Sequence, residues 1–156
     1  MKKLLIFIFA IFLSLNAFAY STTSIGKSYI KSLDSSEHMS ATEVSFVTYK
    51  SIDFVKTDIG VGIVNIFSNN DDMYRVSPIV TLLWNIKKYT LSIEGYTPYD
   101  IKCNDYGWRL GTKVSRQVFI DNLRLYAQVG MENRQFRIEP LKDSTIYAGM
   151  GITIKM

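Results

Sequence analysis

The chain has 156 residues, a formal net charge of +4, and 47% hydrophobic and 13% aromatic residues. This length suits one domain, and so mild a charge argues against a nucleic-acid-binding protein. Cys103 is the only cysteine, so an internal disulfide cannot form. We therefore expect a single domain with no disulfide framework and no nucleic-acid partner.

The N-terminus is typical of a secretory signal peptide, over residues 1–19. Lys2 and Lys3 precede an apolar run, residues 4–15, and a small-x-small cleavage site ends at Ala19. The apolar run is shorter than the ~20 residues that a membrane-spanning helix needs. The residue directly after the cleavage site is tyrosine and not cysteine, which argues against a lipid anchor. We expect the mature domain to be 20–156, with a net charge of about +2 once the two lysines are removed.

The mature sequence alternates between apolar and polar residues with the period of a β-strand. In residues 123–131, for example, the odd positions are apolar and the even positions are polar, glycine or charged. Turn-rich stretches separate such segments at the spacing of an all-β chain. The sequence predicts eight strands, at Thr22–Ser32, Ser40–Tyr49, Asp53–Phe67, Tyr74–Trp84, Tyr89–Thr97, Asp105–Ser115, Asn122–Glu132 and Ser144–Lys155. The first two alternate poorly.

Short and long connections alternate along the chain. The short ones are 50–52, 85–88 and 116–121, and the long ones are 33–39, 68–73, 98–104 and 133–143. This asymmetry is typical of outer-membrane barrels, whose periplasmic turns are tight and whose outward loops are longer. The predicted fold class is all-β: an eight-stranded antiparallel up-and-down transmembrane β-barrel.

The two-residue alternation does not show whether the apolar or the polar face points into the barrel. A soluble periplasmic lipocalin-like barrel with an apolar interior is therefore an alternative. The charges favour the membrane, because a charge that faces lipid at mid-bilayer costs ~2 to 4 kcal/mol. They are therefore expected to pair across the lumen. Seven glycines share the polar parity, which leaves room inside for long side chains. The predicted lumen charge network is Lys56, Asp58, Arg75, Glu94, Arg109, Lys113, Arg124 and Glu132.

Aromatic residues collect near the strand ends on the apolar parity. Amphipathic rings concentrate at both interfaces of a bilayer, which a soluble core would not require. The predicted aromatic girdle is Tyr74, Trp84, Tyr89, Tyr106 and Trp108.

With this pattern the chain resembles the small eight-stranded outer-membrane proteins, the group of OmpX, the opacity proteins and the OmpA transmembrane domain. The resemblance implies a location in the bacterial outer membrane and a structural or surface-interaction role of adhesion type. The partners it implies are outer-membrane lipid and lipopolysaccharide, the barrel-assembly machinery, and a host or cell-surface ligand bound through the loops. The chain departs from the group in ending at Met156, where an aromatic residue is usual, and in placing Pro78 inside a strand.

A lipid-modifying enzyme, a lipid A acyltransferase or deacylase, is the sharpest alternative. It would use His38, the only histidine, which lies in the first long connection with Ser and Glu nearby; Asp71, Asp72, Asp100 and Asp105 lie in other connections at that end. Such residues are also common in solvated turns, so we predict no enzyme, no cofactor and no catalytic residue.

Two further site types are not expected. Residues 69–72, Asn-Asn-Asp-Asp, lack the alternating ligands and glycine of a calcium loop, so no metal site is predicted. Eight strands leave a lumen filled by side chains, which argues against a diffusion pore.

Overall fold

Antiparallel β-strands make up most of the chain that the structure describes. The computed structural model describes residues 20–33, 36, 38–68, 74–100, 105–134 and 143–156. Its strands are β1 (Tyr20–Ser32), β2 (His38–Ile52), β3 (Thr57–Ser68), β4 (Tyr74–Ile86), β5 (Tyr89–Tyr96), β6 (Tyr99–Asp100), β7 (Asp105–Gln117), β8 (Leu123–Arg134) and β9 (Asp143–Lys155). No helix in these ranges is long and apolar enough to cross a membrane.

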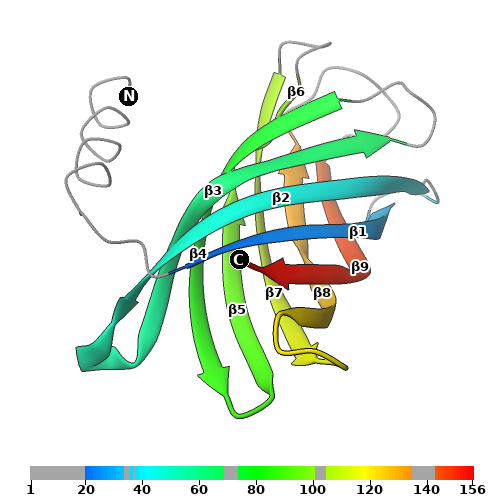
Figure 1. Cartoon of the computed structure of the whole chain (residues 1–156). Helices are drawn as coiled ribbons and strands as arrows, with labels where there is room; N and C mark the ends of the chain where they lie inside the picture. The colour runs from blue at the N-terminus through cyan, green and yellow to red at the C-terminus, as the bar shows by residue number, and fades with distance from the viewer. Residues whose placement is uncertain (1–19, 34–35, 37, 69–73, 101–104, 135–142) are drawn as a thin grey trace.

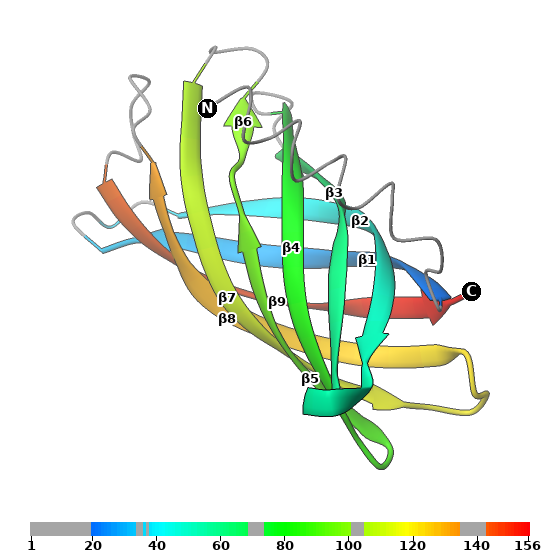
Figure 2. The ribbon, with the colours of Figure 1, turned by 90° about the vertical axis from the view of Figure 1, so that its left-hand side faces the viewer.

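The strands close into a barrel, seen from two sides in Figures 1 and 2. Consecutive long strands pair antiparallel, and β1 also pairs with β9 along most of its length, from Thr22 opposite Lys155 to Ser32 opposite Thr145. The predicted eight-stranded antiparallel up-and-down barrel is therefore confirmed. We call the rim with the hairpins 52–57, 86–89 and 117–123 the turn end, and the opposite rim the loop end.

Two prolines explain why the fifth strand of the barrel is divided into β5 and β6. β6 continues the register of β5 against β4, so the two act as one interrupted strand. Pro78 of β4 and Pro98 lie in the gap between the paired segments, and proline has no N–H to donate. On the other side, Gly107 N donates to Pro98 O at 3.0 Å, so β7 keeps the strand attached. This interruption accommodates the proline that the sequence places inside a strand at position 78.

The hairpin between β2 and β3 differs from the prediction. Residues Asp53–Val55 form one turn of 3-10 helix, and Lys56 ends it with φ 51° and ψ 38°. β3 consequently begins at Thr57. The expectation that Lys56 points into the lumen is wrong, because the residue lies exposed in the turn, outside the alternating part of the strand.

The apolar parity faces outward and the charged parity faces inward. Leu125, Val129 and Trp108 are 50%, 57% and 49% exposed, whereas Arg109 and Glu94 are 1% and 5% exposed. A soluble lipocalin-like barrel would show the opposite arrangement. That alternative is wrong for this fold.

The lumen is not polar throughout. Apolar side chains of β2, β3 and β4 pack inside the barrel, a feature that the prediction missed because it assigned one polarity to each face. The inward apolar wall consists of Ala41, Val47, Val64, Ile66, Ile79 and Leu83. Charged side chains and glycines line the opposite side, from β5, β7, β8 and β9.

Candidate functional site

The centre of the lumen holds a buried ion pair that crosses the barrel. Arg109 Nη2 of β7 lies 2.6 Å from Glu43 Oε1 of β2, and these strands stand on opposite sides of the ring. Ser28 donates to Glu43 Oε1 at 2.5 Å, and Gln128 Nε2 donates to Glu43 Oε2 at 2.8 Å. Glu43 thus joins four strands, and the donors replace the water that its carboxylate loses on burial.

A second buried pair lies closer to the loop end. Arg75 Nη1 of β4 contacts Glu132 Oε1 of β8 at 2.6 Å, and both side chains are almost fully inaccessible to solvent. The two strands are not neighbours in the sheet. This pair therefore also links separate parts of the wall.

Glu94 organises the network nearer the turn end. Its carboxylate accepts hydrogen bonds from Ser92 at 3.2 Å and from Tyr96 at 2.9 Å. Lys113 Nζ lies 3.6 Å from Glu94 Oε1 and also donates to Ser24 Oγ at 3.3 Å. Side chains of β1, β5 and β7 are thereby connected.

Two tyrosines of the lumen lie flat over glycines. A Cβ on Gly111 or Gly130 would overlap with the hydroxyl of Tyr147, so this ring position requires both glycines. The guanidinium carbon of Arg109 lies 3.4 Å from the centroid of the Tyr147 ring. The hydroxyl end of Tyr147 thus contacts the two glycines while its ring contacts the cation, which couples the barrel wall to the buried charge.

Tyr126 repeats this arrangement on the neighbouring strands. A Cβ on Gly26 or Gly151 would overlap with its hydroxyl, and Lys113 Nζ lies 4.2 Å from its ring centroid. Gly26, Gly111, Gly130 and Gly151 therefore leave room for two large side chains, in agreement with the space argument made from the sequence.

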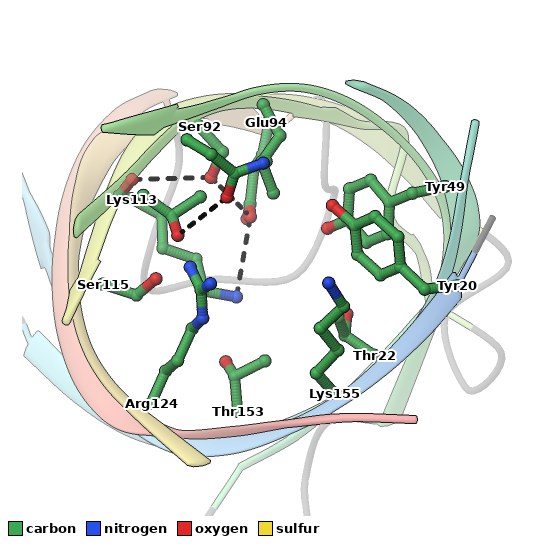
Figure 3. Close-up of a pocket in the computed structure, with 13 residues that line it drawn as sticks. Tyr20, Thr22, Tyr49, Ser92, Glu94, Lys113, Ser115, Arg124, Thr153 and Lys155 are labelled. Carbon is green, nitrogen blue, oxygen red and sulfur yellow. Dashed lines mark hydrogen bonds and ion pairs between the residues drawn. The ribbon is translucent and has the colours of Figure 1, made fainter. Parts of the chain in front are cut away.

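A cavity of about 40 Å³ lies in the turn-end half of the lumen. Figure 3 shows Arg124 and Lys155 projecting into it from β8 and β9, across the lumen from Glu94. Lys155 Nζ lies 4.0 Å from the ring centroid of Tyr20. Such a volume holds roughly two or three water molecules, far less than the ~300 Å³ or more of an organic ligand site.

The structure brings most of the predicted network residues together. Asp58, Arg75, Glu94, Arg109 and Glu132 are buried in the lumen. Lys113 and Arg124 are half-buried and line the cavity. Asp58 contacts no cation in the described part of the chain; its Oδ2 accepts hydrogen bonds from Tyr20 at 2.7 Å and Asn85 at 3.2 Å. Lys56 is excluded, as described above.

Two lumen charges were missed by sequence reasoning. Glu43 belongs to β2, whose inward face is otherwise apolar or small, so the alternation there gave no clear inner parity. Lys155 shares its parity with Gly149, Gly151 and Thr153, and that position alone could have identified it as inward-facing.

The girdle residues lie on the outside near the strand ends. Trp84 and Tyr89 flank the β4–β5 turn, while Tyr74 and Trp108 lie near the loop end. Phe67 stacks on Tyr74 with a centroid distance of 5.1 Å and extends the loop-end group. The side chain of Tyr106 lies outside the described part.

Among the described residues, no contact of His38 with a serine or an acidic side chain supports the lipid-modifying enzyme. His38 is exposed at the start of β2, and its ring lies 5.4 Å from that of Tyr29. Asp71 and Asp72 lie outside the described residues, as do the side chains of Asp100 and Asp105. Within the described ranges no three His, Cys, Asp or Glu side chains gather as metal ligands.

Comparison with known proteins supports the fold. No protein-family model matches the chain, and no curated protein matches it in sequence. Among solved structures, a crystal structure of Neisserial surface protein A is similar, with a TM-score of 0.50 and 14% sequence identity. The match covers 88% of this chain and 96% of that one. At this identity the likeness concerns the fold, a small eight-stranded barrel, which agrees with the family resemblance seen in the sequence.

Proposed function

We propose that the chain is a small outer-membrane β-barrel protein with a non-enzymatic structural or surface-interaction role. The observation that carries this proposal is the sorting of side chains: apolar groups cover the outside, and charges are paired inside. Lipid solvates such an exterior, and barrel closure satisfies every backbone group without water. The similarity to a neisserial surface protein supports the fold on which the proposal depends.

The lumen supports a non-porin role. Ion pairs across the lumen and the side chains of Tyr126 and Tyr147 fill its centre, and the cavity near the turn end is about 40 Å³. Ion conduction requires a continuous aqueous path. We therefore assign the interior a stabilising role and place any partner contact on the loops or the outer face.

Export and membrane insertion are tested by fractionation. We expect cleavage after Ala19 and recovery of the mature chain in the outer-membrane fraction, with gel migration that shifts on boiling because a folded barrel resists detergent. A chain found in the soluble periplasmic fraction, with no shift on boiling, contradicts the proposal.

Orientation is tested with the single native cysteine. Cys103 lies in the connection between β6 and β7, at the loop end. In intact cells a membrane-impermeant maleimide should label it. The control variant Cys103→Ser/Lys88→Cys carries its cysteine in the turn-end hairpin and should react only after the cells are opened. Equal labelling of both in intact cells would contradict an outward loop end.

A further inference from the structure

The outer face of β1 carries two lysines on a barrel exterior that is otherwise mostly apolar. Lys27 and Lys31 are exposed and share the outward parity with Ile25 and Tyr29. Both lie in the loop-end half of the strand, which ends at Ser32. A cation that faces hydrocarbon is costly unless an anion or water is within reach.

Neither lysine has an acidic partner among the residues that the structure describes. Every acidic side chain that the structure describes either points into the lumen or lies in a turn-end hairpin. On neighbouring strands, Lys27 stands opposite Thr42 and Met150. Lys31 stands opposite His38 and Ile146. Within the described residues, the two positive charges on this outward face therefore lack a counter-charge, and an external anion can supply it.

The surface around the lysines combines hydroxyls and rings. Ser40 and Thr42 point outward from β2 beside them, and Ser40 is the register partner of Tyr29. Tyr29 is 47% exposed, and the ring of His38 lies against it. Hydroxyls and exposed rings of this kind suit a sugar, whereas a bare fatty acyl chain would need neither.

Apolar residues continue directly toward the turn end. Ile25 and Phe46 are 49% exposed, and Met150 of β9 is 72% exposed. A ligand that spans both zones would place acyl chains on these residues and its anionic head on Lys27 and Lys31. We call the outward residues Lys27, Tyr29, Lys31, His38, Ser40 and Thr42 the basic patch.

We propose that the basic patch binds a phosphorylated glycolipid of the outer leaflet, with the phosphates on Lys27 and Lys31 and the sugar beside Tyr29. The inference rests on the proposed function, since it requires the loop end to face outward. Charge complementarity identifies the ligand, because the anions that Lys27 and Lys31 can reach in that leaflet are the phosphates of lipid head groups.

The test uses the folded mature chain in detergent micelles, titrated with diphosphorylated lipid A and followed by native mass spectrometry. Wild type and Lys27→Gln/Lys31→Gln are compared with the matched control Lys50→Gln/Lys88→Gln, which removes two cations near the turn end. Wild type and control should bind alike. The patch variant should bind at least about ten-fold more weakly.

Ligand controls identify the recognised chemistry. Dephosphorylated lipid A, phosphatidylglycerol and inorganic phosphate should each bind wild type more weakly than diphosphorylated lipid A does. Equal binding of lipid A by wild type and the patch variant, or an equal preference of wild type for phosphatidylglycerol, overturns the inference.

Failure of the inference and failure of the proposed function are distinguishable. Boiling-dependent gel migration of each variant reports whether the barrel has folded and inserted. Variants that shift normally yet bind lipid A alike overturn only the basic patch. A wild-type chain that neither shifts nor enters the outer membrane overturns the proposed function, and the patch with it.

Discussion

The two sides of the lumen wall are stabilised by different forces. On β2, β3 and β4 a group of apolar side chains is buried against the barrel's own interior, beside inward polar and charged residues such as Asp58 and Arg75. On β7, β8 and β9 the inward residues are charges, tyrosines and glycines, held by ion pairs and ring stacking. A small barrel can therefore combine a packed core with a charge network. Arg75 of β4 and Glu43 of β2 each pair with an opposite charge across the lumen, Arg75 with Glu132 and Glu43 with Arg109.

The largest expected effect comes from removing Glu43. Glu43→Leu leaves the guanidinium of Arg109 buried with no carboxylate, and we expect a loss of about 3 to 5 kcal/mol in the free energy of unfolding. Urea unfolding in lipid vesicles, followed by tryptophan fluorescence, measures it. The double variant Glu43→Leu/Arg109→Met should recover most of the loss, since no unpaired charge remains. A single variant that costs under about 1 kcal/mol would contradict the central role of this pair.

A cavity in the apolar side should cost somewhat less. Ile66 is 1% exposed in the lumen, and Ile66→Ala should lose about 3 kcal/mol through both the transfer and the cavity contributions. The matched control is Ile63→Ala on the outer face of the same strand, where Ile63 is 52% exposed. Lipid can fill the space left outside, so only the transfer contribution is lost there. Equal losses at the two sites, in the same urea assay, would show that the inner wall is not packed.

The contact between Tyr147 and Gly111 predicts a smaller loss of unfolding free energy on the charged side of the lumen. Gly111→Ala places a methyl group where the tyrosine hydroxyl lies, and displacing the ring should cost about 1 to 3 kcal/mol. Tyr147→Phe in the same chain should restore part of this. Gly95→Ala is the control, because a Cβ there meets no atom within 4 Å. If the variant at position 111 is as stable as that at 95, the ring does not depend on the glycine.

The smallest effect is expected at the cavity. Arg124 is half-buried and has no carboxylate within ion-pair distance among the described residues, so Arg124→Gln should change the unfolding free energy by about 1 kcal/mol or less. The midpoint of urea unfolding checks this. A loss as large as that of Glu43→Leu would mean that Arg124 has a structural partner.

The accuracy of the sequence prediction follows the same division. Where the inner face is polar, as in β7, β8 and β9, strand positions and orientation were predicted within a few residues. Where apolar and polar residues share the inner face, as in β2 and β3, alternation carries less information. Glu43 went unrecognised for this reason. Lys56 was misplaced because the 3-10 turn shifts the start of β3 to Thr57, a local choice that strand periodicity does not encode.

By itself, the sequence determined the fold class, the strand number and which parity faces outward, because period-two polarity and turn spacing are local properties of the chain. The tertiary structure alone decided which inward charges meet. Gln128 and Glu43 are 85 residues apart, and Arg109 and Glu43 are 66 apart. Barrel closure and strand register bring them within hydrogen-bonding distance, and both depend on all the strands together.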